Sequence, residues 1–318
     1  MRRKLLKNLK FTGNVYTFGF SNMNLTITTE GFPVLGETLY TNQDFFFSCG
    51  GKALNQAITT KRLGAHVSLI SMVSTDEYGK ELLKCLEEND INTNYLFRSS
   101  EKSGLSIINT NEFGQNKIIC CPGINRLLSE IKDFSGIPIK KGDIVICSLE
   151  VSQKVLLPFI RECYEREAII IVDASSRNAE EDNVQLYPFI DILKPNEVEM
   201  LRFGQENSTL TQRLETMKEK GITLPLISLG ENGIVYLDDQ VRTIPSLKVK
   251  AVDTTGAGDI FIGTVASMLS SNNYNITESL VLAVIASGLS VCMKGSIASI
   301  PKVEEIKKVY EERTINVI

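Results

Sequence analysis

The chain has 318 residues, of which 43% are hydrophobic and 23% are charged, and its formal net charge at pH 7 is −4. These values are typical of a globular protein with a full core, built as one large domain or as a domain with a small appendage. The charge gives no basic field, so nucleic acid is not an expected partner. The single histidine, His66, and the absence of paired cysteine spacing argue against a zinc site or a Ser-His-Asp triad.

Other global features predict a soluble, cytoplasmic protein. No secretory signal accompanies the seven cysteines, so we expect reduced, largely buried thiols. Met1 to Lys10 is basic but lacks a long apolar core, which favours a solvated tail over a targeting segment. The uncharged run from Ser279 to Met293 is shorter than the roughly 20 residues that span a bilayer. It predicts a buried helix, and no membrane association is expected.

Strand-like and helix-like patterns alternate in the first half of the chain. Val15 to Phe20 predicts a buried strand that leads into a loop with polar side chains at Asn22. A glycine turn at Gly50-Gly51 opens a helix that ends near Leu63. The other expected elements are strand-like segments at 37–40, 44–48 and 67–72, a helix at 80–89, and segments 104–109 and 116–121 around the turn 111–114. The last two segments predict a hairpin.

The second half repeats a strand–helix rhythm. Strands are expected at 143–149, 168–172, 190–193, 224–229 and 234–237, and helices open at Lys194–Glu199 and cover 303–310. This alternation implies an α/β fold with a mostly parallel sheet and helices on both faces. In such sheets ligands bind beyond the carboxyl ends of the strands. We therefore expect the groups that follow the strands to converge, namely Glu150, Asp173, Asn196, Gly230 and the turn from Asp253 to Asp259.

The stretch Val252-Asp253-Thr254-Thr255-Gly256-Ala257-Gly258-Asp259 is the strongest candidate site. It lies between apolar residues and an apolar helical pattern, so it reads as a turn that enters a helix. Its glycines allow a tight bend, and the helix N-terminus offers unpaired N–H donors and partial positive charge to an anion, most often phosphate. Asp259 is either a dipole-complementary residue or a catalytic carboxylate.

Known phosphate-binding loops are absent elsewhere. The first strand carries no G-x-G-x-x-G turn, and no Walker A spacing occurs. An anion nest with an aspartate suits phosphoryl transfer to a hydroxyl, in which the amides hold the phosphoryl group and the carboxylate accepts the proton. Such transfer needs a divalent metal, and Asn196 with Glu199 is suited to holding its water shell. The same pair also fits a simple helix cap.

Five motifs together resemble one family. They occur in the order and spacing of the ribokinase-like (PfkB) sugar and nucleoside kinases, and the match extends from Val15 to Val309. The motifs are Gly50-Gly51-Lys52-x-x-Asn55-Gln56-Ala57, Glu150, Lys194-Pro195-Asn196-Glu197-x-Glu199, Asp253-Thr254-Thr255-Gly256-Ala257-Gly258-Asp259 and Lys294-Gly295-x-x-x-Ser299-Ile300-Pro301. The first two look most like the ribokinase branch.

The resemblance implies a single ribokinase-like domain over residues 1–318. Its mostly parallel sheet has helices on both faces, and a small β-sheet lid at about 37–48 and 103–121 covers the sugar and forms a homodimer contact. The implied reaction uses ATP and Mg²⁺ to phosphorylate the primary hydroxyl of a small sugar, ribose first, giving ribose 5-phosphate, and K⁺ is the implied activator.

The resemblance also implies a role for each motif residue. Asp259 is the implied general base, and the amides of Gly256, Ala257 and Gly258 form the anion hole. The sugar site is lined by Asn22, Asn24, Gly51, Lys52, Asn55, Glu150 and Asp259. ATP is held by Asn196, Ser228, Gly230, Gly233 and Gly258. Glu199 binds Mg²⁺ through water, and the monovalent cation lies beside Asp253, Thr255, Ser290, Gly295 and Ser299.

Two departures from the family pattern concern the substrate. Asn24 stands where the family has a sugar-binding aspartate, and Ala53-Leu54 stands where Gly-Ala is expected. An asparagine offers one acceptor and two donors, whereas a carboxylate accepts with both oxygens. The alternatives left open are therefore a kinase of fructose, a deoxy-sugar or a nucleoside such as pseudouridine, or a sugar-binding regulatory protein with weak activity.

Overall fold

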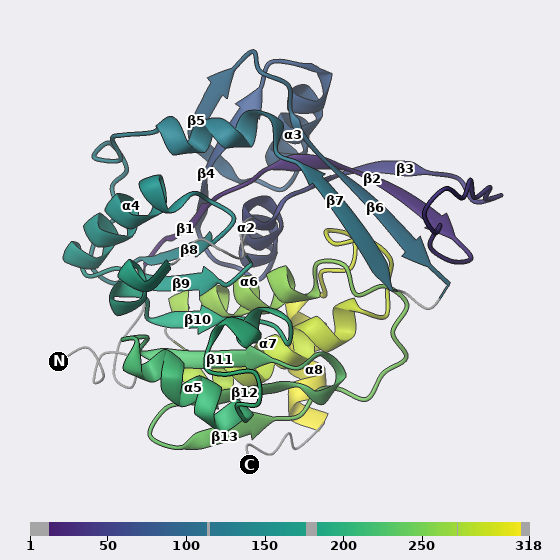
Figure 1. Ribbon diagram of the computed structural model, residues 1–318. Coiled ribbons are helices and arrows are strands. Elements are labelled where there is room, and N and C mark those ends of the chain that lie inside the picture. Colours follow the sequence, from purple (N-terminus) through teal and green to yellow (C-terminus); the bar gives the residue numbers. More distant parts are fainter. Residues whose placement is uncertain (1–12, 113–114, 176–182, 272, 313–318) are drawn as a thin grey trace.

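The computed structural model describes residues 13–112, 115–175, 183–271 and 273–312 (Figure 1). The predicted basic tail, Met1 to Lys10, lies outside these residues. Within them, none of the helices has the length and apolarity that a membrane span requires.

A nine-stranded sheet crosses the described part of the chain in the order β13-β12-β11-β10-β9-β8-β1-β4-β5. Neighbours from β5 to β11 pair parallel, whereas β12 and β13 are antiparallel at one edge. The expected mostly parallel sheet is thus confirmed, and β5 and β13 were not expected. The strands are β1 (Val15–Phe18), β4 (Val67–Ser74), β5 (Asn92–Ser99), β8 (Ile144–Ser148), β9 (Ile169–Asp173), β10 (Ile192–Lys194), β11 (Leu224–Ser228), β12 (Ile234–Leu237) and β13 (Val241–Ile244).

Helices cover both faces of this sheet because its central strands are apolar at every position. In β8, Ile144 and Ile146 belong to one core cluster, and Val145 and Cys147 belong to the other. The first cluster packs against α2 (Lys52–Arg62), α3 (Glu77–Glu88), α6 (Ala257–Ser270), α7 (Ile276–Ser290) and α8 (Val303–Glu312). The second packs against α4 (Gln153–Glu165), α5 (Leu210–Glu219) and the 3₁₀ segment η2 (Gly123–Glu130). The uncharged run is confirmed as a buried helix, α7.

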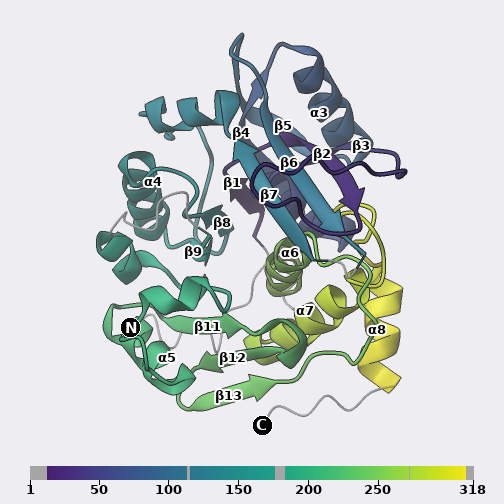
Figure 2. The ribbon, with the colours of Figure 1, turned by 45° about the vertical axis from the view of Figure 1, so that its right-hand side comes forward.

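A separate four-stranded sheet, the lid, projects from the body (Figure 1). Its order is β3-β2-β6-β7, and β6 and β7 form the expected hairpin. Its strands are β2 (Asn22–Thr29), β3 (Phe46–Gly50), β6 (Gly104–Asn111) and β7 (Asn116–Cys121). In Figure 2 the lid lies over the start of α6, where Asn116 Nδ2 donates to Thr255 Oγ1 at 3.4 Å.

Two expectations about the lid were wrong. Residues 37–40 form no strand, and the expected polar loop at Asn22 is strand β2. Polar and apolar residues alternate along β2, so Asn24 shares one face with Ser106 of β6, whereas Leu25 lies on the opposite face. This alternation, and not the polarity of the segment, determines its structure.

The face of the lid opposite Asn24 carries an apolar row. Phe47, Leu25, Ile107 and Ile119 are paired in register across the four strands, and the exposed fraction of Ile119 is 65%. The homodimer contact inferred from the family resemblance stays a prediction.

The expectation that the thiols are largely buried was also wrong, although all seven are free. All seven thiols lie in the described residues, yet full burial is limited to Cys147 and Cys163. Strand β8 and helix α4 place these two thiols in the core. The other five lie on the lid, on α3 and after α7, where apolar side chains cover them only in part. They are Cys49 and Cys85, which are half-buried, and Cys120, Cys121 and Cys292, which are exposed.

Candidate active site

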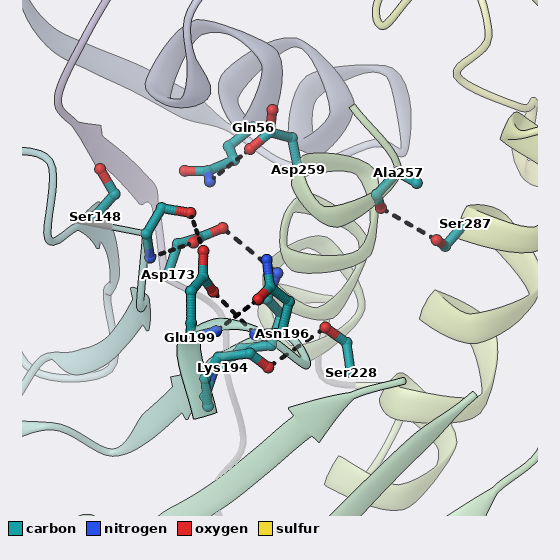
Figure 3. A network of polar contacts seen from close by, with 12 residues as sticks. Gln56, Ser148, Asp173, Lys194, Asn196, Glu199, Ser228, Ala257, Asp259 and Ser287 are labelled. Atoms are coloured by element: carbon teal, nitrogen blue, oxygen red, sulfur yellow. Dashed lines mark hydrogen bonds and ion pairs between the residues drawn. The ribbon is translucent and has the colours of Figure 1, made fainter. Parts of the chain in front are cut away.

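The groups that follow the parallel strands meet near the N-terminus of α6 (Figure 3). The carboxylates of Asp173, Asp259, Glu150 and Glu199 all act electrostatically on the ammonium group of Lys52. Because these acids come from four separate segments, their convergence is a consequence of sheet topology. The expected convergence is confirmed for Glu150, Asp173 and Asp259.

The turn before α6 has the conformation that its glycines allow. Gly256 has φ of 80°, a left-handed value that residues with a Cβ rarely adopt. A Cβ at this position would also lie 2.5 Å from Cβ of Ser296. The backbone can therefore approach the 294–299 loop closely while α6 begins at Ala257. The Ala257 amide donates a long hydrogen bond of 3.3 Å to the Thr254 carbonyl, and the next first-turn amides of α6 have no partner within the helix, as an anion hole requires.

Asp259 is buried and held by two amide side chains from α2. Asn55 Nδ2 donates to Oδ2 at 2.9 Å, and Gln56 Nε2 donates to Oδ1 at 3.0 Å. Burial raises the pKa of Asp259, while the charge of Lys52 opposes that shift. A residue that only complemented the helix dipole would not need both oxygens fixed by another helix, so the geometry favours a positioned base. Gln56 lies in the first motif, but its contact was not predicted.

Lys52 and Glu150 face each other across the same site. Burial alone would lower the pKa of Lys52, but Asp173, Asp259, Glu150 and Glu199 together raise it. Burial raises the pKa of Glu150 to about 7, and Lys52 limits the shift. Ser148 Oγ donates a long hydrogen bond of 3.4 Å to Glu150 Oε2. Lys52 is thus positively charged, and Glu150 titrates near neutral pH.

A second lysine, which the sequence analysis did not assign, lies beside the anion hole. Lys194 is 5% exposed, and its Nζ is 3.5 Å from Asp173 Oδ2. A Cβ at Gly258 would lie 3.0 Å from the same Nζ, so the ammonium group adjoins the first turn of α6. Burial alone would raise the pKa of Asp173, but Lys194 and Lys52 lower it. Lys194 and Asp173 end neighbouring parallel strands, and this position is the feature of the sequence from which their pairing could have been inferred.

The proposed sugar residues of β2 lie at the junction of lid and body. Asn22 Nδ2 donates to Asn24 Oδ1 at 3.1 Å and to Ser106 Oγ at 2.8 Å. A Cβ at Gly51 would lie 2.7 Å from Asn22 Oδ1, so a side chain there would displace Asn22. Asn24 is 6% exposed. The Asn24 side-chain oxygen thus already accepts one hydrogen bond within the protein.

The second departure from the family pattern does not reach this pocket. Leu54 is fully buried in the core cluster with Ala53, beneath the first turn of α2. Its larger side chain fills core volume. Of the two departures, Asn24 is therefore the one that stays a candidate for affecting the substrate.

Asn196 and Glu199 form a reciprocal cap and not part of a long helix. Asn196 Oδ1 accepts from the Glu199 amide at 2.8 Å, and Glu199 Oε2 accepts from the Asn196 amide at 2.9 Å. The expected helix is only the 3₁₀ turn η5 (Glu199–Arg202). Glu199 Oε1 also accepts from Ser175 Oγ at 2.8 Å. The cap leaves lone pairs on the carboxylate, which can still accept from water.

The turn that was predicted to bind nucleotide lies beside this cap. The Ser228 amide donates to the Pro195 carbonyl at 3.0 Å, and a Cβ at Gly230 would lie 3.7 Å from Glu197 Oε2. Gly233 has φ of 87° and packs against the Ile244 carbonyl, where a Cβ would clash. Ser228 and Gly230 therefore adjoin the segment around Asn196, whereas Gly233 lies against the end of β13.

The predicted monovalent-cation residues lie on two adjoining loops. The Asp253 amide donates to the Val291 carbonyl at 3.2 Å, and the Gly295 amide donates to Asp253 Oδ2 at 2.8 Å. The Thr255 amide donates to Asp253 Oδ1 at 2.9 Å, and the Ser299 amide donates to the Gly295 carbonyl at 3.3 Å. Ser290 is buried at the end of α7. A carboxylate and backbone carbonyls are the hard oxygen donors that suit an alkali cation.

The donors also fit magnesium, but only as an ion bound chiefly by phosphates and water. Across the described ranges of the chain, no three His, Cys, Asp or Glu side chains gather into a metal-binding group. Mg²⁺ in phosphoryl-transfer sites usually keeps several waters and uses one or two carboxylates. Glu199 meets that requirement.

Comparisons with known proteins agree with this geometry. Residues 13–303 match the family described as pfkB family carbohydrate kinase. The chain belongs to the pfkB family. It is 31% identical to a ribokinase of Lactococcus lactis over 95% of this chain and 98% of that protein. It is 28% identical to a deoxyribokinase of Salmonella typhi over 93% and 98%.

Solved structures of pfkB-type kinases share the fold. The ribokinase of Thermotoga maritima has a TM-score of 0.82 at 29% identity, covering 94% of this chain and 99% of that one. The Arabidopsis thaliana ribokinase, solved with ribose and ATP, also has a TM-score of 0.82, at 25% identity over 94% and 98%. The expected ribokinase-like fold is confirmed, and the chain is an ATP-dependent carbohydrate kinase of the ribokinase-like type.

The raised pKa of Glu150 predicts a pH-dependent stability difference. Between about pH 4.5 and 7 the native state binds the proton that the unfolded chain releases, so stability falls as the pH rises. Glu150→Gln removes this loss. We expect its free energy of unfolding, relative to the wild type, to increase by on the order of 3 kcal/mol between pH 5 and pH 8.

Urea unfolding at the two pH values measures the difference. The attraction of Lys52 acts only on the ionised carboxylate and is already included in the pKa of about 7, so the comparison needs no separate correction for it. Glu87→Gln, on the exposed side of α3, is the matched control. An equal difference at pH 5 and pH 8 would contradict the titration of Glu150 near neutrality.

Proposed function

We propose that this kinase transfers the γ-phosphoryl group of ATP to the primary hydroxyl of ribose, forming ribose 5-phosphate. The observation that carries this proposal is the buried carboxylate of Asp259, fixed by Asn55 and Gln56 at the N-terminus of α6. A carboxylate held in this way can accept the hydroxyl proton while the amides of Gly256, Ala257 and Gly258 hold the migrating phosphoryl group. The ribokinase relatives support ribose as the first substrate.

Charge around the anion hole supports the same assignment. The γ-phosphoryl group is strongly negative, so a site that holds it needs cationic groups close by. Lys52 at the start of α2 and Lys194 at the end of β10 bring two ammonium groups to this site, and both lie among carboxylates. We assign Lys194 to the migrating phosphoryl group and Asp173 to holding Lys194 in place. Lys52, which adjoins the Gly51 turn, serves sugar and phosphoryl group together.

The remaining residues bind ATP and ions in this proposal. Asn196 and the Ser228–Gly233 turn hold the nucleotide, with Glu199 on the water shell of Mg²⁺, which neutralises phosphate charge when bound. The loops of Asp253 and Gly295 hold K⁺ and so fix the turn that begins α6. Turnover compared in potassium and sodium salts tests this cation site.

A deoxy-sugar is the second candidate substrate, and Asn24 favours it. The Asn24 oxygen already accepts one hydrogen bond from Asn22, so the amide offers a sugar one remaining lone pair, whereas an aspartate offers two oxygens to two sugar hydroxyls. A sugar that lacks one hydroxyl loses less in such a pocket. A deoxyribokinase is among the relatives. The regulatory-protein alternative has no such support, because the base and the anion hole are both present.

Asp259→Asn should reduce turnover by at least a hundredfold while ATP binding stays nearly unchanged. The amide cannot accept the proton, although it keeps the volume and part of the hydrogen bonding to α2. ADP release measures turnover, and calorimetry measures ATP binding. Asp133→Asn, in an exposed loop, is the control. A variant that retained substantial turnover would show that Asp259 is not the base.

Lys194→Met should lower kcat by about a hundredfold with little change in the KM for the sugar, because its ammonium faces the phosphoryl group. The single change leaves Asp173 with one cationic partner fewer, which costs stability. The double variant Asp173→Asn/Lys194→Met removes both charges and separates the two effects. A normally folded double variant with wild-type kcat would show that Lys194 takes no part in the reaction.

Asn24→Asp should increase the preference for ribose over 2-deoxyribose. The new carboxylate accepts from two hydroxyls, so we expect the ratio of the two kcat/KM values to rise roughly tenfold to a hundredfold. Steady-state assays with both sugars measure the ratio. Asn94→Asp on β5 is the control. An unchanged ratio would show that Asn24 does not contact the sugar.

A further inference from the structure

A cavity of about 610 Å³ lies outside the site described above, between lid strand β3 and helix α3. The loop that carries Gly295 forms one wall. Two cysteines and several charged residues line the cavity, namely Cys49, Cys85, Arg62, Glu81, Lys84 and Glu88. The proposed phosphoryl transfer uses none of these residues. The cavity is open to solvent, so small molecules can reach the side chains that line it.

The two thiols come from different parts of the fold and line the same cavity. Cys49 lies on β3, and its Sγ is 3.7 Å from the carbonyl oxygen of Glu81, one helical turn before Cys85 on α3. Each thiol shifts the pKa of the other, as expected for two sulfur atoms that lie close together. Packing of Phe47 against Tyr78, with ring centroids 5.7 Å apart, holds β3 against α3.

The surroundings of Cys85 favour a thiolate. Asn89 Nδ2 approaches Cys85 Sγ at 3.9 Å, and the Asn89 oxygen accepts from Arg62 Nε at 3.1 Å. The hydrogen bond from Cys49 is the main cause that lowers the pKa of Cys85. The charge of Arg62 adds to it, while burial and Glu88 oppose it. The pKa of Cys49 is raised. We therefore assign Cys85, whose sulfur lies beside the Asn89 amide and near Arg62, as the attacking thiol.

We propose that Cys85 and Cys49 form an oxidation site at which a hydroperoxide converts the two thiols into a disulfide. The Cys85 thiolate attacks one peroxide oxygen, the O–O bond breaks, and the leaving hydroxide takes a proton to become water. Cys85 is then a sulfenic acid. The Cys49 sulfur attacks the Cys85 sulfur, the S–O bond breaks, and the second hydroxide leaves with the Cys49 proton. Two thiols lose two electrons, and hydrogen peroxide becomes two waters.

The disulfide would join the lid to the body. Cys49 immediately precedes Gly50, where β3 ends and the turn to Lys52 begins. A covalent bond to α3 therefore restricts the segment that carries the sugar-binding turn. This consequence rests on the proposed function, whereas the oxidation itself does not.

Peptide mass spectrometry tests the oxidation. The fully reduced protein is treated with hydrogen peroxide at a stoichiometric amount, free thiols are alkylated, and the digest is analysed without reduction. We expect one dominant cross-link, between the peptides that contain Cys49 and Cys85. In Cys49→Ser we expect no cross-link and a sulfenic acid at Cys85 that dimedone traps. Cys292→Ser, which removes an exposed thiol, should leave the yield unchanged.

Two results would overturn the oxidation site. One is oxidation of the exposed thiols Cys120, Cys121 and Cys292 before Cys85, and the other is a Cys85 that reacts without forming the cross-link. Turnover is measured separately on oxidised protein and after dithiothreitol. We expect a raised KM for the sugar, reversed by reduction and absent in Cys49→Ser. A cross-link without this change would refute only the effect on the lid.

Discussion

Charge balance in a buried site is the constraint on which the active centre depends. Asp173, Asp259, Glu150 and Glu199 are brought together by the fold, and isolated carboxylates in such a place would be neutralised by proton uptake. Lys52 and Lys194 offset part of that cost. Asp173 is held ionised by both lysines, whereas Glu150, with Lys52 alone, titrates near pH 7. The cluster therefore has four carboxyl groups to two lysines, and its net charge depends on the protonation of Glu150.

Topology explains why this cluster exists at all. In the nine-stranded sheet the neighbours from β5 to β11 pair parallel, so each of these strands delivers its carboxyl end to one edge of the sheet. The two lysines have different origins: Lys194 ends β10, and Lys52 begins α2 just after the lid. The site is therefore assembled from the body and from the junction with the lid. Neither part contains a complete set of charges.

The sequence predicted the parts of this site that are local. The turn from Asp253 to Asp259 could be read directly, because glycine conformations and helix starts depend on neighbouring residues. The parallel sheet could also be predicted, from alternating strand and helix patterns. Strand β2 was missed because its polar residues suggested a loop, although their alternation with Met23, Leu25 and Ile27 is that of a half-buried strand.

Contacts between distant segments could not be predicted from the residues themselves. The Lys194–Asp173 pair and the hold of Gln56 on Asp259 join residues that are separated by at least one whole element. The residues Asn196 and Glu199 could be interpreted as a helix cap or as a pair that holds the water shell of a metal. The structure contains the cap, and the carboxylate can still accept hydrogen bonds from water. Burial of individual cysteines was likewise outside the reach of composition, because it depends on which edges the helices leave uncovered.

The chemistry and the choice of sugar lie on different structural elements. Asp259 and the anion hole belong to α6, which is buried in the body, whereas Asn22 and Asn24 belong to β2 of the lid. A substitution in β2 can change which hydroxyls are recognised without moving the base, because α2 fixes Asp259 independently of β2. Leu54, the other departure from the family pattern, is absorbed by the core. In the proposed reaction, the choice of sugar therefore depends on a lid strand in which the Asn24 oxygen already accepts one hydrogen bond from Asn22.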